Sequence, residues 1–123
     1  MALGANRRAL LDGNQERFVK TDIAFHIAIA EASHSPIYVA LTRAVLGWLM
    51  EHRYRIVATG IDQKAAFVEH EQLFERIRAR DHAGAIEAMR RHLVRISGPD
   101  DRHLLATLTA LSKAPVPCGD DDR

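Results

Sequence analysis

Four side chains along this chain are of the types that bind a divalent metal ion: Asp22, His26, His70 and His92. Asp22 and His26 are four residues apart, so on a helix both side chains leave the same face, one turn from each other. A carboxylate oxygen and an imidazole nitrogen on neighbouring turns offer half of a metal site. We expect the four side chains to meet inside a helical bundle and to hold one ion at the floor of a ligand pocket.

A histidine in a predicted core does not by itself indicate a metal. For a single one, the more common explanation is a structural ring that is hydrogen-bonded to a carbonyl group. The pair Asp-x-x-x-His is also weak evidence, because such pairs arise by chance. Here three inward histidines and one aspartate lie on three predicted helices, and one ion would satisfy all four side chains. An open set of three histidines and one aspartate suits zinc, nickel, manganese or cobalt, with zinc as the default.

Other candidate site residues carry a weaker signal. Arg53, Tyr54 and Arg55 lie together near the end of a predicted helix and could bind an anion in a pocket. Such a cluster is more often a solvated face. The remaining histidines lie near predicted helix ends or on polar faces, where exposed surface residues are the simpler interpretation: His34, His52, His82 and His103.

The composition excludes several classes of protein. Of the 123 residues, 47% are hydrophobic and 27% charged, with a formal net charge of +1, so no strong field directs the domain to DNA or an anionic membrane. No run of about eighteen apolar residues is present to cross a bilayer, and the first residues do not form a secretory signal. A single cysteine, Cys118, excludes a disulfide framework and favours the cytoplasm.

Apolar residues recur at helical spacing and strand signals are scarce, which predicts an all-α protein. We expect an antiparallel bundle of five to six helices in one domain over residues 1–112, incomplete at its N-terminus. A disordered tail is expected over 113–123, where proline, glycine and aspartate dominate. The predicted helices cover 4–12, 15–33, 36–58, 62–80 and 82–96, with a possible sixth over 100–111.

Local signals mark where these helices begin and end. Gly13 suits a left-handed C-terminal cap, and Ser35 can cap the next helix with Pro36 at its first position. Asp81 can cap the helix that carries His92. The apolar stripes predicted to face the core are Phe18, Phe25, Ile29 and Ala32; Ile37, Ala40, Leu41, Ala44, Val45, Trp48 and Leu49; Phe67, His70, Leu73, Phe74 and Ile77; and Ala85, Ile86, Met89, His92, Leu93 and Ile96.

The ordered combination of these residues resembles a known domain. Asp22-x-x-Phe25-His26, then Glu69-His70, then Asp81 with Ala85, Met89 and His92-Leu93, is similar to the FCD domain, the C-terminal effector-binding domain of FadR-subfamily GntR transcription regulators. The resemblance runs from about Leu10 to Ile96. It includes the spacing of the histidines, with 43 residues between His26 and His70 and 21 between His70 and His92.

The resemblance implies a fold, a ligand set and a role. It implies an antiparallel all-α bundle with a metal at its centre, bound by Asp22, His26, His70 and His92, and a small organic acid beside the ion. It also implies that effector binding changes the placement of an N-terminal winged helix-turn-helix on DNA. Two departures stand out. In the first, we expect the winged helix-turn-helix and the family's first helix or two to be missing from this chain.

The second departure follows the first metal-binding helix. The family often has Gly-Asn-Pro there, where this chain has His34-Ser35-Pro36. Because serine is shorter than asparagine, we expect effector choice to differ, and Ser35 joins Arg53 and Tyr54 as a candidate effector-binding residue.

The favoured interpretation is a metal-containing effector-binding and dimerisation domain of a bacterial transcription regulator, and not an enzyme. We expect a small carboxylate effector, a cytoplasmic homodimer, no membrane partner, and DNA binding only through a missing N-terminal domain. One alternative is a small metal-dependent hydrolase or lyase. Its candidate base, Glu69, would point about 100° away from His70 on a helical wheel. The other alternative is a structural bundle whose histidines only fill the core.

Overall fold

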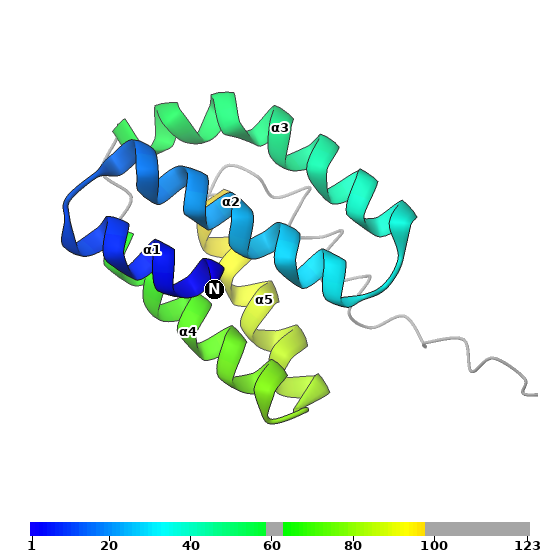
Figure 1. Cartoon of the computed structure of the whole chain (residues 1–123). Helices are drawn as coiled ribbons and strands as arrows, with labels where there is room; N and C mark the ends of the chain where they lie inside the picture. Colours follow the sequence, from blue (N-terminus) through cyan, green and yellow to red (C-terminus); the bar gives the residue numbers. More distant parts are fainter. Residues whose placement is uncertain (59–62, 98–123) are drawn as a thin grey trace, which may run out of the picture. The chain divides into compact units, whose positions relative to one another are not determined.

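The described part of the chain is entirely helical. The computed structural model describes the backbone of residues 1–58 and 63–97 and the side chains of residues 1–47 and 63–95. The possible sixth helix, the tail over 113–123 and the C-terminal bound of the predicted domain therefore lie outside the described residues. The described helices (Figure 1) are α1 Ala2–Leu11, α2 Gln15–Ala32, α3 Pro36–Ala58, α4 Gln63–Arg78 and α5 His82–Ser97. The predicted all-α class is confirmed.

The chain divides into two compact units, and the division falls within α4. The first unit spans Met1–Glu71 and the second Gln72–Arg123. In the first unit α2 packs beside both α1 and α3, and the three helices run in alternating directions (Figure 1). None of the described helices combines the length and apolar content that a bilayer span requires.

The turn between α1 and α2 follows the predicted glycine signal. Gly13 adopts a left-handed backbone with φ of 64°, and its N–H donates to the Leu10 carbonyl. Asn14 then caps α2, because its side-chain oxygen accepts a bond from the Arg17 N–H at 2.9 Å. The cap at Asn14 was not predicted, although asparagine is among the preferred residues at this position.

The turn between α2 and α3 uses a histidine where glycine would be less strained. Ser35 caps α3 as predicted, with its hydroxyl accepting from the Tyr38 N–H at 3.3 Å. His34, just after α2, has φ of 55°. A side chain with a Cβ is disfavoured in this left-handed region, so His34 holds a conformation that the surrounding caps must stabilise.

The apolar core of the first unit joins three helices. Ala9 of α1, Phe18 of α2, and Ala66 and Phe67 of α4 form one buried cluster, against which Leu3 and Leu10 pack.

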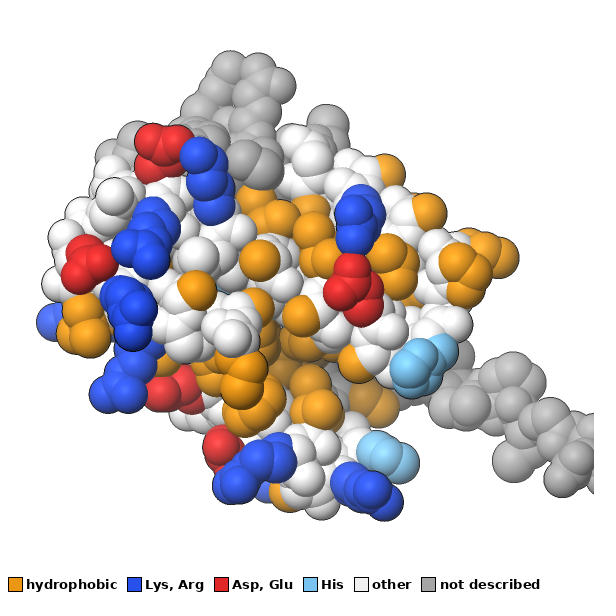
Figure 2. Space-filling view, viewed as in Figure 1, with side chains coloured by type: hydrophobic (Ala, Val, Ile, Leu, Met, Phe, Trp, Pro, Cys, Tyr) orange, Lys and Arg blue, Asp and Glu red, His pale blue; other side chains and the backbone are white. Residues whose placement is uncertain are grey.

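The predicted stripe of α2 is wrong at its end, because Ala32 is exposed. On α3 the predicted stripe is largely at the surface: Ile37, Leu41 and Val45 are 81%, 59% and 45% exposed. Tyr38, which was not part of the stripe, is also 47% exposed. Of the residues predicted to face the core, Trp48, Leu49 and Ile96 have side chains outside the described residues. Figure 2 shows apolar side chains at the surface where α3 begins.

The second unit is built around the turn between α4 and α5. Asp81 caps α5 as predicted: its Oδ1 accepts from the Gly84 N–H at 2.9 Å, and its Oδ2 pairs with Arg76 Nη1 at 2.8 Å. The Gly84 amide, followed by Arg76, lowers the pKa of the Asp81 carboxyl. A Cβ atom added at Gly84 would lie only 2.1 Å from Asp81 Oδ2. The Asp81 cap therefore requires a residue without a side chain at position 84.

Two apolar residues predicted to face the core do not. Ile77 and Ile86 are 41% and 60% exposed, whereas Leu73, Ala88 and His92 are buried. α4 also ends at Arg78, two residues before the predicted end, and Arg80 has a left-handed φ of 57° in the turn.

Candidate metal centre

Asp22 and His70 meet inside the first unit. Asp22 lies in the middle of α2 and is 2% exposed, while His70 of α4 is fully buried. Asp22 Oδ1 and His70 Nε2 are 3.2 Å apart. A buried carboxylate loses the stabilisation of water, so a positive charge or hydrogen-bond donor beside it is needed to keep it ionised. A proton or a cation shared with the imidazole meets that need.

His26 stands next to this pair, one turn along α2 from Asp22. Its ring lies edge-on to the His70 ring, with centroids 5.2 Å apart and planes at 86°. One nitrogen of His26 and one of His70 lie within 4.8 Å of each other. Phe25 stacks at a tilt on His70, with ring centroids 4.6 Å apart, and closes one side of the group with an apolar wall.

The environment keeps His26 uncharged. Burial among apolar groups disfavours the imidazolium and lowers the pKa of His26 from 6.5 to about 4. A metal binds the neutral imidazole through a free nitrogen lone pair. His26 is therefore in the protonation state of a metal ligand at neutral pH, without any cost of removing a proton.

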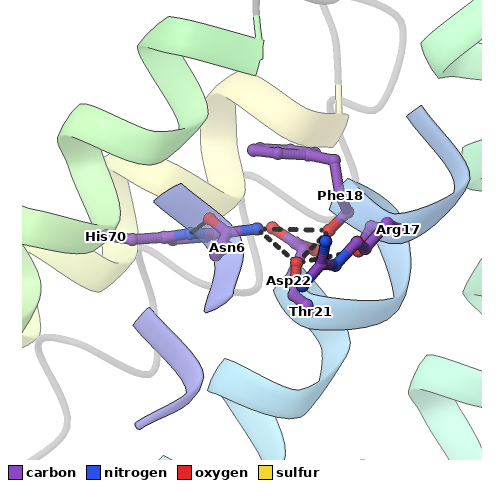
Figure 3. A network of polar contacts seen from close by, with 6 residues as sticks. All are labelled: Asn6, Arg17, Phe18, Thr21, Asp22 and His70. Carbon is purple, nitrogen blue, oxygen red and sulfur yellow. Dashed lines mark hydrogen bonds and ion pairs between the residues drawn. The ribbon is translucent and has the colours of Figure 1, made fainter. Parts of the chain in front are cut away.

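Asn6 of α1 also belongs to this network, and it was missed from the sequence. It is fully buried, its Nδ2 donates to the Phe18 carbonyl at 3.1 Å and to Thr21 Oγ1 at 3.0 Å, and its Oδ1 lies 3.4 Å from His70 Nδ1 (Figure 3). A signal was available, because Leu3, Asn6 and Leu10 share one face at helical spacing. A polar residue on that face indicates a buried partner.

His92 is the remaining predicted ligand. It lies on α5 in the second unit, one turn after the buried Ala88, and its side chain is fully buried. An imidazole is a common metal ligand, so His92 has the residue type and the burial that the prediction requires. Among the predicted ligands, Asp22, His26 and His70 come together within the first unit.

The predicted effector-binding residues are not gathered around the histidines by any described contact. The Ser35 hydroxyl caps α3, as described above. Arg53 and Tyr54 lie in α3, and their side chains are outside the described residues. Of the histidines predicted to be at the surface, His34 and His82 are exposed, and His52 and His103 are outside the residues whose side chains are described.

The donor set and its surroundings are of the kind that can hold a divalent ion. Two imidazoles and a carboxylate lie together in a buried, largely apolar setting, and His26 is neutral. Nitrogen and carboxylate donors of this kind are shared by zinc, nickel and manganese sites, so they do not select one metal.

Comparisons with known proteins give a consistent result. The FCD domain model matches residues 1–95. The chain is 33% identical over 115 residues to the HTH-type transcriptional repressor NanR of Klebsiella aerogenes, covering 92% of this chain and 40% of that protein. It is 32% identical over 94 residues to NanR of Cronobacter sakazakii, covering 75% of this chain and 35% of that protein. It is 29% identical over 98 residues to NanR of Escherichia coli K12, covering 78% of this chain and 36% of that protein. The chain thus spans 40% or less of the length of these relatives. No solved structure matches.

Proposed function

We propose, because the chain belongs to the FCD domain family, that it is the metal-containing effector-binding and dimerisation part of a GntR/FadR-type bacterial transcription regulator. The relatives that it matches are transcriptional repressors, so the family is not one of enzymes. In this proposal a helix-turn-helix outside these residues binds DNA, and the helical domain senses a small organic acid in the cytoplasm, where transcription is controlled.

The observation that carries the proposal is the contact between Asp22 and His70. A carboxylate and an imidazole nitrogen 3.2 Å apart, buried and with the neutral ring of His26 beside them, are arranged as metal ligands are. We propose that Asp22, His26 and His70 are three ligands of one ion and that His92 of the second unit is the fourth. Zinc is the proposed metal, with nickel or manganese as alternatives.

The effector is proposed to be a small carboxylate. A divalent ion held by four protein ligands keeps open positions and presents a Lewis-acidic face to an anionic oxygen. Arg53 and Tyr54 are proposed to bind the rest of the acid by charge-assisted and neutral hydrogen bonds, and Ser35 to shape the end of the pocket. Ser35→Ala would then change effector affinity, besides weakening the cap of α3.

Metal content tests the proposed ligands. Protein purified without chelator is compared with Asp22→Asn and His70→Ala variants, and with His34→Ala as a control that removes an exposed histidine. We expect one equivalent of metal in the wild type and in His34→Ala, and loss of stoichiometric metal in the two ligand variants. Equal metal in all four proteins, or none in the wild type, would contradict the proposal.

Dimerisation is proposed to use a second copy of the chain on the exposed apolar face of α3. Ile37, Leu41 and Val45 recur every four residues on that face. Leu41→Glu places a charge there, whereas Leu11→Glu places one on α1 at a residue that is 77% exposed. Light scattering should show dimers for the wild type and Leu11→Glu and monomers for Leu41→Glu. A monomeric wild type at micromolar concentration would refute this part of the proposal.

A further inference from the structure

We infer that Asn6 is a positioning residue for the metal centre, because its amide fixes which nitrogen of His70 carries the proton and which presents a lone pair to Asp22. This inference rests on the proposed function, since the lone pair concerned is the one offered to the ion. Asn6 reaches the site from α1, whereas the ring that it orients belongs to α4 and the facing carboxylate to α2 (Figure 3).

The orientation of the Asn6 amide follows from its neighbours. On one side, the Phe18 carbonyl lies 3.1 Å away and can only accept a hydrogen bond. On the same side, Thr21 Oγ1 is 3.0 Å away, and its hydroxyl hydrogen is directed to a backbone carbonyl of α2, so it too accepts from Asn6. Two acceptors require the NH2 group of Asn6 on this side. Its carbonyl oxygen, Oδ1, must therefore face His70.

The orientation of Asn6 determines the state of the His70 ring. Asn6 Oδ1 lies 3.4 Å from His70 Nδ1 and can only accept, so Nδ1 carries a hydrogen and donates it. In the neutral ring the other nitrogen, Nε2, then has its lone pair exposed. That lone pair faces Asp22 Oδ1 at 3.2 Å.

Two acceptors at this distance repel each other unless a positive charge lies between them. Either a proton or a metal ion can supply it. Metal-bound histidines commonly donate their second ring N–H to an oxygen, which fixes the tautomer and the direction of the ring. Asn6 occupies that role for His70. An apolar residue at position 6 would let the ring place its hydrogen on Nε2 and donate to Asp22, which closes the site to the ion.

The test measures zinc affinity and ring protonation in the full 123-residue chain. Asn6→Leu removes the amide and keeps a side chain of similar size. Asn6→Asp keeps an oxygen toward His70 but loses the donor toward Phe18 and Thr21. Phe18→Leu is the control for lost stability, because the Phe18 ring packs in the apolar cluster and the substitution keeps the backbone oxygen that accepts from Asn6.

Zinc affinity is measured by competition with a chromophoric chelator. We expect Asn6→Leu to bind zinc about 10- to 100-fold more weakly than the wild type, the range found when such an outer partner is removed. Asn6→Asp should retain most of the affinity although its stability falls, and Phe18→Leu should retain all of it. Equal affinity in Asn6→Leu and Phe18→Leu would overturn the inference.

Ring protonation is read from the imidazole nitrogen shifts of His70 in metal-free protein by NMR. We expect Nδ1 to be protonated in the wild type, and Nε2 to be the protonated nitrogen of the neutral ring in Asn6→Leu. A wild-type ring with an unprotonated Nδ1 would overturn the inference even if zinc binds. A wild type that binds no metal but shows the expected tautomer would refute the proposed function and leave the role of Asn6 in place.

Discussion

Acidification of the metal-free protein should reduce its stability through His26. In the folded chain burial lowers the pKa of His26 to about 4, whereas in the unfolded chain the ring returns to about 6.5. Between these two values the unfolded state binds a proton that the folded state does not. The free energy of unfolding therefore has its full contribution from His26 above pH 6.5 and loses it as the pH falls from 6.5 to 4.

The size of this effect follows from the difference between the two pKa values. A drop from 6.5 to about 4 corresponds to about 3 kcal/mol of stability at most, spread over that pH range. For a domain with a stability of roughly 5–15 kcal/mol, the loss is a large part of the total. Below pH 4 His26 contributes no further change, because both states are then protonated.

Urea unfolding at a series of pH values, with EDTA present throughout, measures this dependence. Other side chains also exchange protons over this range, so the wild type is compared with His26→Gln, which has a neutral side chain of similar size at position 26. The difference between the two proteins isolates His26. We expect the wild type to lose about 3 kcal/mol more than His26→Gln between pH 6.5 and pH 4. Parallel curves for the two proteins would show that His26 does not cause the loss of stability.

Three further predictions concern the turns that hold the helices. His34→Gly should raise the free energy of unfolding by about 0.5–1 kcal/mol, since glycine adopts a φ of 55° without a Cβ clash, and Gly13→Ala should lower it for the converse reason. Urea unfolding that ranks the two variants in the opposite order would be evidence against backbone strain at His34. Asp81→Ala should lower the thermal midpoint and speed amide exchange at the start of α5, while Asp81→Asn, which keeps an acceptor for the Gly84 N–H, should lose less. Gly84→Ala should destabilise as well, because its methyl group would overlap the Asp81 carboxylate, and an unchanged midpoint would show that the cap can move aside.

Much of the helical framework could be predicted because its signals are local. Gly13, Ser35 with Pro36, and Asp81 each fix a turn through their own backbone or side-chain chemistry, and each lies where it was expected. The start of α5 at His82 follows directly from its cap.

Burial was predicted less well, because periodicity identifies a face without identifying what covers it. Ile86 belongs to the predicted stripe of α5, but it lies on nearly the opposite side of the helix from the buried Ala88 and is 60% exposed. Ile37, Leu41 and Val45 form a regular apolar row that stays at the surface. Whether a neighbour covers such a row depends on contacts distant in sequence, which spacing alone does not encode.

The sequence was enough to select the side chains that meet at the candidate site, but not the residue that supports them. Asp22 and His26 were recognisable from a four-residue spacing, and His70 from a histidine on an apolar stripe. Asn6 was missed because nothing in the local sequence of α1 identifies the side chain that it contacts. Its partner His70 is 64 positions away along the chain, and only the packing of α1 beside α2 reveals the connection.

X-ray absorption at the zinc edge of the zinc-loaded chain tests the central claim most directly, since it counts and identifies the atoms bound to the ion. For the proposed metal centre we expect a first shell of nitrogen and oxygen at about 2.0–2.2 Å, with outer-shell scattering from three imidazole rings. A shell without imidazole scattering, or one that is unchanged in His70→Ala, would contradict it.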